Sequence, residues 1–173
     1  VDPAPIKGGI GVYFTRLVVG GVDFAILEDR KFKTGPDGTI PQMGPRPDHI
    51  VDPDYDRAAI DLPGLKLLGE RQLGWLRTWA DDWQGVRAKC ALSQTAFCGA
   101  VHLHGNPDNR LLADLDCNGW PQAGRNEALR ILKRAGAVHL CGDQHLAVVV
   151  QHGIDDYRDG PWSFTSPALV NTF

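Results

Sequence analysis

The chain has 173 residues, of which 43% are hydrophobic, and a formal net charge of −3. This length suits one domain with its own hydrophobic core. Lysine and arginine are scattered rather than clustered, so the charge pattern gives no footprint of a protein that binds nucleic acid or a membrane surface. No apolar run approaches the roughly 20 residues that a membrane-spanning helix needs. The four cysteines form no Cys-x-x-Cys pair, which argues against a zinc finger or a redox dithiol.

The first third of the chain predicts short strands followed by a long loop. Residues 12–14 and 17–19 read as a hairpin that turns at Thr15-Arg16, and residues 22–27 read as the next strand after a Gly-Gly turn. Residues 31–63 are rich in Pro, Gly and Asp without a sustained period, which is typical of a functional loop or an insertion. Six polar residues of this loop are interpreted as a solvated surface: Arg46, Asp48, His49, Asp52, Asp54 and Asp56.

The rest of the chain alternates predicted strands and helices. Apolar residues three and four apart predict helices at 68–83 and 126–135, the second with Asn126 as its N-cap. One face of the first helix is formed by Leu73, Leu76, Ala80 and Trp83, with Trp75 and Trp79 beside it as core residues. Strands are predicted at 88–97, 137–141, 146–151 and 164–170, the last an edge strand because it contains Pro167. This alternation predicts the α/β fold class.

Asp143 and His145 follow directly after the predicted strand 137–141. On an extended backbone, two residues two positions apart point their side chains the same way. A carboxylate oxygen and an imidazole nitrogen together suit a divalent or trivalent metal ion. Open α/β sheets also carry their chemistry at the carboxyl ends of their strands. For this pair alone, the simpler alternative is a structural turn in which Asp143 caps backbone amides.

A second polar cluster begins at Asp114 with the pattern Asp-x-Asp-x-Asn-Gly, which opens an EF-type calcium loop. The twelfth position of such a loop needs a glutamate but holds Arg125, and the eighth holds Pro121, which has no N–H to donate. These two departures argue against an EF-type loop, and a free-standing calcium module built on Asp114 to Gly119 is the weakest of the alternatives. Asp114, Asp116 and Asn118 alternate, so they could still face one ion in an extended segment; the alternative is an Asx-rich turn before a helix.

Arg125 stands next to the predicted start of the helix at 126–135. A guanidinium group and the free backbone amides of a helix start together suit a phosphate group. An ordinary surface arginine at a helix start is the alternative interpretation.

Five segments of the chain carry a resemblance to a known family. They are Leu27 to Lys33, Leu68 to Leu73, Leu92 to Thr95, Asp114 to Arg125, and Gly142 to His145. In that order they resemble the later part of the PhoD-like (alkaline phosphatase D type) metallophosphatases, over about Gly9 to Asn171. Glu28 stands where the family pattern has aspartate, and Leu146 where it has serine.

The resemblance implies a calcineurin-like metallophosphoesterase β-sandwich, two sheets flanked by helices, with a two-metal site at the strand ends. Asp143, His145 and Asp116 would be metal ligands, Asn118 would lie beside them as a catalytic residue, and Arg125 would neutralise the phosphate. Two-metal sites activate water and hold the phosphoryl oxygens during in-line displacement. Iron with calcium, manganese or zinc all remain possible metals, and Glu28 with Arg30 is expected to form a buried structural pair.

The family's early motifs, which hold its first metal ligands, have no counterpart in this sequence. Residues 1–173 are therefore expected to be one partial domain that lacks its N-terminal half. The implied parent is a phosphatase or phosphodiesterase that hydrolyses phosphate esters, and the alternative is a non-catalytic module that binds an ion or a partner. Family relatives suggest an extracytoplasmic location, which nothing in the chain decides. The chain by itself is expected to expose apolar surface and to aggregate.

Overall fold

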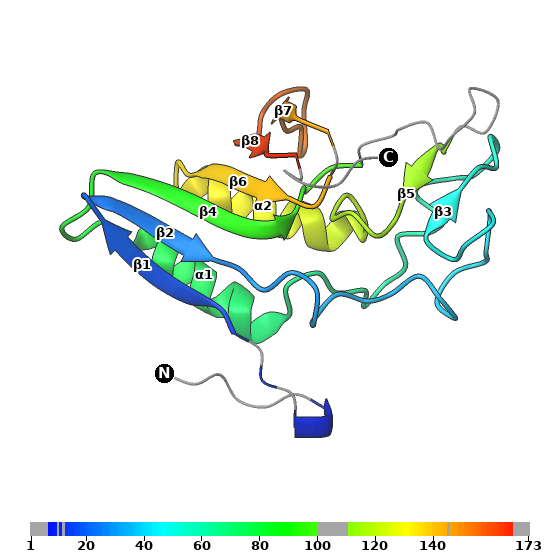
Figure 1. The fold of residues 1–173 in the computed structure, drawn as a ribbon, viewed down its shortest axis with the longest axis horizontal. Coiled ribbons are helices and arrows are strands. Elements are labelled where there is room, and N and C mark those ends of the chain that lie inside the picture. The colour runs from blue at the N-terminus through cyan, green and yellow to red at the C-terminus, as the bar shows by residue number, and fades with distance from the viewer. Residues whose placement is uncertain (1–6, 10, 12, 100–110, 145, 168–173) are drawn as a thin grey trace.

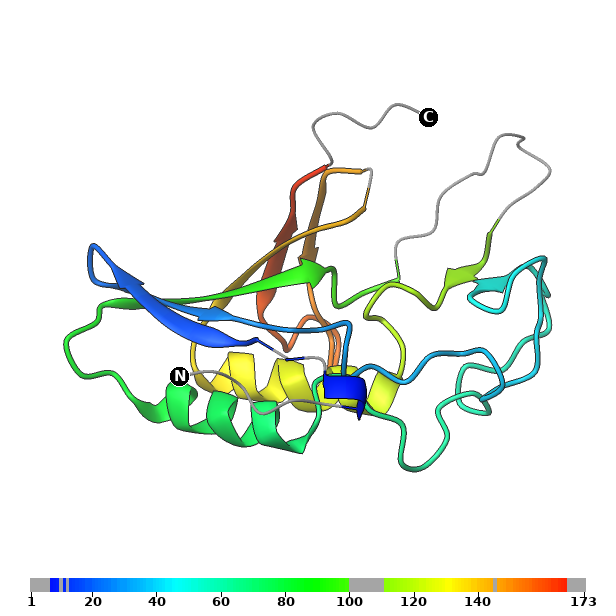
Figure 2. The same cartoon turned by 60° about the horizontal axis from the view of Figure 1, so that its bottom comes forward.

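The computed structural model describes residues 7–9, 11, 13–99, 111–144 and 146–167. Its elements are η1 (Lys7–Gly9), β1 (Thr15–Val19), β2 (Val22–Ile26), β3 (His49–Ile50), α1 (Glu70–Asp81), β4 (Ala88–Thr95), β5 (Ala113–Asp114), α2 (Gln122–Arg134), β6 (Val138–Gly142), β7 (Val148–Gln151) and β8 (Trp162–Thr165). A six-stranded mixed sheet and two helices on one side of it form the main body, which confirms the predicted α/β class (Figures 1 and 2). In the described part of the chain, neither helix has the length and apolar character needed to cross a bilayer.

The sheet has the strand order β1-β2-β4-β6-β8-β7. The four central strands β2, β4, β6 and β8 run parallel, and the antiparallel strands β1 and β7 form the two edges. Crossovers that contain α1 and α2 connect β2 to β4 and β4 to β6, as parallel pairing requires. The carboxyl ends of the parallel strands therefore meet along one edge, and the loops that follow β2, β4 and β6 are brought together there.

The first hairpin forms at a different place from the predicted one. Strand β1 begins at Thr15 and pairs with β2 through a turn at Gly20 and Gly21, whose φ angles are 59° and 82°. The predicted turn at Thr15-Arg16 is therefore wrong. Two glycines supply the positive φ values that a two-residue hairpin turn needs, whereas β-branched Thr15 favours a strand. Arg16 also stabilises this pairing, because its Nε donates to the Asp23 carboxylate at 2.9 Å across the two strands.

Both helices form close to where they are predicted, with different ends. Helix α1 is two residues shorter at each end than the predicted range 68–83. Trp83 lies beyond it and is 45% exposed, so its predicted place on the buried face is wrong. Helix α2 starts at Gln122, directly after Pro121, which is its N-cap residue and has an extended backbone. Asn126 is therefore inside the helix rather than its N-cap.

The last strand also differs from its prediction. β8 ends at Thr165, before Pro167, and it lies between β6 and β7 rather than at the edge. The antiparallel strand β7 forms the edge instead. Because Pro167 follows the strand, it removes no hydrogen bond from the ladder. The remaining positions of the predicted strand, 168–170, lie outside the described residues.

Two hydrophobic cores hold the molecule together. The larger one packs α1 and α2 against one face of the sheet through Ala25, Ala91, Leu76, Trp79, Leu129 and Leu132 and their neighbours. The smaller one lies away from the sheet and contains Ile40, Ile50, Ile60, Leu115 and Trp120. It gives the long segment 31–65 a buried centre, although β3 is the one strand in that segment.

The sheet face opposite the helices is apolar and open. Ile26, Leu92, Leu140, Phe164 and Val149 are successive cross-strand partners over five strands. Leu140, Phe164 and Val149 are 38%, 41% and 61% exposed. Parallel sheets are normally covered on both faces and carry apolar residues on both. This open face therefore has the composition of a buried surface. Its exposed apolar side chains agree with the prediction that the chain by itself exposes apolar surface.

Candidate functional site

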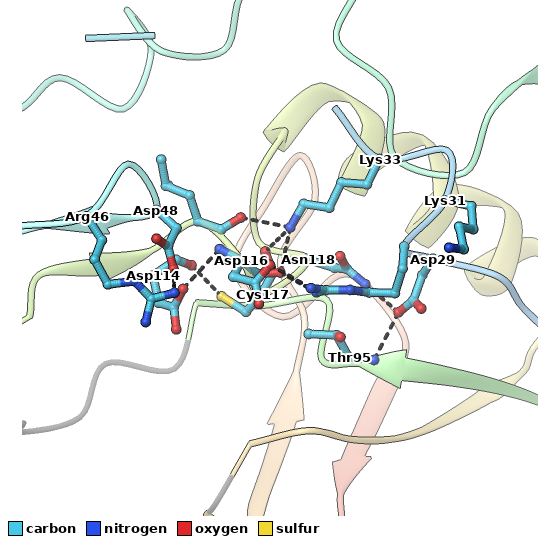
Figure 3. A network of polar contacts seen from close by, with 12 residues as sticks. Asp29, Lys31, Lys33, Arg46, Asp48, Thr95, Asp114, Asp116, Cys117 and Asn118 are labelled. Carbon is cyan, nitrogen blue, oxygen red and sulfur yellow. Dashed lines mark hydrogen bonds and ion pairs between the residues drawn. The ribbon is translucent and has the colours of Figure 1, made fainter. Parts of the chain in front are cut away.

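Asp29 is the centre of the polar site at the carboxyl ends of β2 and β4 (Figure 3). It lies three residues after the end of β2 at Ile26, and none of its surface is exposed. Its Oδ2 accepts hydrogen bonds from the Thr95 backbone N–H at 2.9 Å and from the Asn118 amide at 2.6 Å. Its Oδ1 accepts from the Gln94 backbone N–H at 3.3 Å. Burial raises the pKa of Asp29, and these hydrogen bonds from Thr95, Gln94 and Asn118 oppose that shift.

Asn118 is completely buried, and its amide orientation follows from its partners. Nδ2 donates to Asp29, which can only accept when ionised, so Oδ1 is the atom on the other side of the amide. That Oδ1 is buried and has no hydrogen-bond partner among the residues that the structure describes. An unpartnered amide oxygen next to carboxylates is a group that a hard cation such as calcium, magnesium or manganese accepts as a ligand. Asn118 therefore fits the metal chemistry that the resemblance implies.

Asp116 is brought to the same edge but is already paired with a cation. Arg30 Nη2 contacts its carboxylate at 2.7 Å, and Arg30 Nη1 donates to its backbone oxygen at 3.0 Å. Burial opposes the charge of Arg30, but the carboxylates of Asp116, Asp143 and Asp29 together raise its pKa. The predicted Glu28–Arg30 side-chain pair is wrong, because Glu28 accepts from the Arg30 backbone N–H at 2.9 Å instead. Arg30 thus lies among three carboxylates at the strand ends.

Lys33 supplies a second cation, and it sits on the backbone of the loop that contains Asp116 (Figure 3). Its Nζ donates to the carbonyl oxygens of Leu115, Asp116 and Cys117 at 2.7, 2.6 and 2.9 Å. Burial lowers the pKa of Lys33 to about 8, whereas three carbonyl acceptors favour the ammonium form. An ammonium group therefore occupies the set of carbonyl oxygens that a loop of this sequence could offer to a metal ion.

The three alternating polar side chains of this loop each have a partner within the protein. Asp116 is paired with Arg30, and Asn118 is bonded to Asp29. Asp114 Oδ1 accepts from the Asp116 backbone N–H at 2.9 Å, which is an Asx turn. The Asx-turn alternative therefore holds for Asp114, whereas a metal role for Asp116 and Asn118 stays a prediction.

Arg125 lies in the first turn of α2, half-buried, and its guanidinium group is held by four acceptors. Nε donates to the Phe97 oxygen at 2.9 Å, and Nη1 donates to Asn126 Oδ1 at 2.6 Å and to the Gly153 oxygen at 2.9 Å. Nη2 donates to Nδ1 of His152 at 3.1 Å. Burial lowers the pKa of Arg125. No ion pair joins it to a carboxylate of the described residues, so its charge is not neutralised by direct contact.

A chain of buried hydrogen bonds continues from Arg125 across the sheet. Nε2 of His152 contacts Ser163 Oγ at 2.5 Å, Ser163 Oγ contacts Nδ1 of His139 at 2.7 Å, and Nε2 of His139 contacts Ser93 Oγ at 2.6 Å. Ser93 donates onward to the Thr95 oxygen at 2.8 Å. Because Arg125 can only donate, each link has one direction, and both histidines are neutral with the proton on Nε2. This series of hydrogen bonds connects α2 to the carboxyl ends of the strands.

A cavity of about 460 Å³ opens beside Arg125. Its lining also includes the side chains of Arg57, Asp114, Trp120 and Gln122. The guanidinium of Arg125 has five N–H groups and donates four to the protein. Among the described residues, Arg125 therefore has no carboxylate in contact and one N–H without an acceptor, and it lies on a cavity wall, which suits an anionic group.

The sequence predicts a metal site at Asp143 and His145, which follow the strand β6. Asp143 follows β6, is exposed, and has a φ of 69°, a left-handed conformation that is uncommon outside glycine. It lies close enough to Arg30 to raise the pKa of that arginine. His145 lies outside the described residues, so its position relative to Asp143 stays a prediction.

A second group of metal-ligand side chains lies in the long segment 31–65. Asp48, His49 and Asp114 each offer one ligand atom, and these atoms lie within 4.8 Å of one another. Asp48 and His49 were interpreted as solvated surface, but their side chains are only 15% and 13% exposed. That interpretation is wrong, because the pairing of β3 with β5 brings His49 opposite Asp114.

No protein-family model matches the chain, and no curated protein matches its sequence. A solved structure of PhoD matches 95% of the chain with a TM-score of 0.64 and 17% sequence identity. The chain shares its fold with part of PhoD. The match covers 30% of the PhoD chain, so the present chain spans less than a third of the length of that protein. At this level of identity the likeness establishes the fold alone.

Asp29 and Lys33 are site residues that sequence reasoning missed. Asp29 ends the apolar strand of residues 22–27 in the way that Asp143 ends the strand of residues 137–141. Carboxylates in equivalent places after two parallel strands of the same sheet were a usable signal. Lys33 gave no such signal, because its partners are backbone oxygens more than 80 residues away in the sequence.

Proposed function

We propose that this chain is the later part of a metal-dependent phosphoesterase domain that hydrolyses phosphate monoesters or diesters. The main support is that Asn118 is hydrogen-bonded to Asp29 and that Arg30 interacts with both Asp29 and Asp143, beside the carboxyl ends of parallel strands in a fold that PhoD shares. All three residues belong to the segments that resemble the PhoD-like metallophosphatases. This combination of place, side-chain chemistry and motif favours the enzyme over a module without chemistry.

In this proposal, Asp143, His145 and Asp116 are metal ligands, and Asn118 Oδ1 is a further oxygen for the same site. A bound metal pair supplies activated water and charge neutralisation of the phosphoryl group. Asp29 holds Asn118 so that Oδ1, rather than Nδ2, is available. Arg125 contributes positive charge and one N–H to a phosphate oxygen, because no carboxylate of the described residues contacts its guanidinium.

We further propose that residues 1–173 are one partial domain. The open face of the sheet supports this, because a parallel sheet with apolar residues on both faces is built to be covered on both. The missing part of the same domain is expected to cover Leu140, Phe164 and Val149 and to supply the other metal ligands. The short match to PhoD is consistent with this division.

The test compares a parent polypeptide that carries the upstream region with its Asp143→Asn/His145→Ala double variant. Metal content is measured, together with hydrolysis of p-nitrophenyl phosphate and bis-p-nitrophenyl phosphate. The expected result is that the variant loses bound metal and at least 100-fold in activity, on the order of a lost two-metal site. Asp54→Asn, an exposed carboxylate in the long segment, is the control and should leave both unchanged. A parent that is inert with iron, calcium, manganese and zinc would contradict the enzyme.

A non-catalytic module is the second candidate, and one observation favours it. Arg30 already forms an ion pair with the Asp116 carboxylate, and Lys33 already donates to the carbonyl oxygens of the same loop. If these two cations replace metal permanently, the parent should show no metal-dependent rise in its thermal midpoint and no metal-dependent hydrolysis. In the enzyme, Arg30→Gln should instead tighten metal binding several-fold, because it frees the Asp116 carboxylate.

A further inference from the structure

Asp48, His49 and Asp114 form a compact group at the ladder between β3 and β5. His49 is the cross-strand partner of Asp114, and Asp48 precedes it. Backbone hydrogen bonds hold the two segments in register, from Leu115 N–H to the Asp48 oxygen at 2.8 Å and from Leu112 N–H to the Ile50 oxygen at 2.7 Å. The three ligand atoms are thus positioned by paired backbone rather than by free side-chain rotation.

The three side chains of this group bring two carboxylates and an imidazole close together. Two carboxylates share a site whose ligand atoms lie within 4.8 Å, and Arg46 contacts one of them, Asp48, at 3.1 Å. The charge of Asp114 also favours the ammonium form of Lys33, whose Nζ is held by three backbone oxygens. The side chain of Arg46 is 65% exposed, so solvent weakens its effect on Asp48. Asp48 Oδ2 also approaches His49 Nε2 to 3.5 Å, which places a nitrogen ligand beside the oxygen ligands.

We propose that Asp48, His49 and Asp114 bind one first-row divalent cation, Zn²⁺ or Mn²⁺, separately from the strand-end site. Imidazole and carboxylate ligands together suit these ions, whereas calcium prefers oxygen ligands alone. Asp114 also lines the cavity of about 460 Å³, which gives an ion a route from solvent and room for water as a further ligand.

The position of this site indicates its role. It joins the long segment 31–65, whose regular structure is one two-residue strand, to the loop that carries Asp116 and Asn118. Figure 3 shows Asp48 and Asp114 at one end of the polar network and Asp29 at the other, with Asp116 and Asn118 between them. A metal ion that closes a long loop stabilises the folded state and holds the connected segment in place. The cation is therefore a structural clasp for the loop of the strand-end site.

The experiment uses the metal-free chain and four variants, with Zn²⁺ and Mn²⁺ added separately. His49→Gln and Asp114→Asn remove single ligands. Asp54→Asn removes an exposed carboxylate of the same segment, and Asp143→Asn removes a proposed ligand of the strand-end site. Thermal midpoints and metal stoichiometry by equilibrium dialysis are measured for each. At free metal 100-fold above the dissociation constant, the wild-type midpoint should rise by roughly 5–10 °C.

The expected pattern keeps this rise in Asp54→Asn and Asp143→Asn and abolishes it in His49→Gln and Asp114→Asn, with one ion fewer bound. If the metal-dependent rise in the thermal midpoint is lost in Asp143→Asn alone, the proposed site at Asp48, His49 and Asp114 is overturned and the strand-end metal site is supported. The two proposals can therefore fail separately. If the ligand variants do not fold, the wild-type side-chain ¹H–¹⁵N spectrum decides. A His49 ring resonance that does not shift when metal is added overturns the proposal.

Discussion

The amide of Asn118 donates to the carboxylate of Asp29 at 2.6 Å, and this single bond decides which atom of Asn118 is left for chemistry. Asp29 is itself held by backbone N–H groups of Gln94 and Thr95, so it cannot turn away. The buried Oδ1 of Asn118 consequently has no hydrogen-bond partner in the described part of the chain. A residue after β2 therefore controls the orientation of a residue in the loop before α2, which lies 89 positions away in the sequence.

Asp29→Asn is expected to lower the free energy of unfolding by roughly 2–3 kcal/mol. In the native protein the Asp29 carboxylate accepts from Gln94, Thr95 and Asn118. An asparagine would turn an NH₂ group toward some of these donors, so at least one buried N–H would lose its acceptor. Urea unfolding monitored by tryptophan fluorescence measures the effect. Asp37→Asn makes the same chemical change at an exposed position and should alter stability by less than about 0.5 kcal/mol. Equal effects of the two substitutions would contradict the role of Asp29.

Lys33→Met is expected to destabilise the fold by roughly 2–3 kcal/mol, because it leaves three carbonyl oxygens without their donor. Lys31→Met is the matched control, since Lys31 is exposed and two positions away. Hydrogen exchange should locate the change in the loop of residues 114–118. If the Lys33→Met protein is as stable as the Lys31→Met protein, the free-energy cost of burying the ammonium group equals the stabilisation from its hydrogen bonds, and the prediction is contradicted.

The buried histidines predict a loss of stability in mild acid. Burial lowers the pKa of His139 to about 3 and that of His152 to about 4. As pH falls below about 6.5, the unfolded chain binds protons that the folded chain does not bind. The free energy of unfolding should therefore fall by roughly 1 kcal/mol per pH unit for each histidine, down to pH 4 for His152 and pH 3 for His139.

Urea unfolding at pH 7, 6, 5 and 4.5 measures this slope. Ring-proton chemical shifts of the two histidines, followed over the same range, give a direct check. Normal titration of His139 near pH 6.5 would contradict the neutral hydrogen-bond chain through Ser163. The same result for His152 would contradict its acceptance of a hydrogen bond from Arg125.

The open sheet face predicts aggregation of the chain alone and the positions that relieve it. Val19→Thr with Val149→Thr keeps the shape and strand preference of two exposed residues, so it should reduce dye binding and aggregation. Val150→Thr, on the opposite face of β7, is the control and should not reduce either. In a parent whose missing part covers this face, Val149→Thr should instead destabilise by about 1 kcal/mol. A chain that remains monomeric without binding the dye would contradict the prediction.

The sequence by itself determined the α/β class, both helices and the sites where polar residues follow apolar strands. These features depend on periodicity and on neighbours within a few positions, which the order of residues records directly. Their ends were less certain. Helix α2 begins at Gln122, before the predicted N-cap Asn126, because its first turn carries no apolar period that would mark it in the sequence.

Only the tertiary structure decided which polar groups meet. The pairing of β3 with β5 brought His49 to Asp114, and the parallel order of β2 and β4 brought Asp29 to Thr95 and Asn118. Arg30 and Lys33 filled places that the spacing of the acidic residues suggested for a metal ion. Contacts between residues more than 60 positions apart depend on strand order and register, and no local pattern of residue types records these.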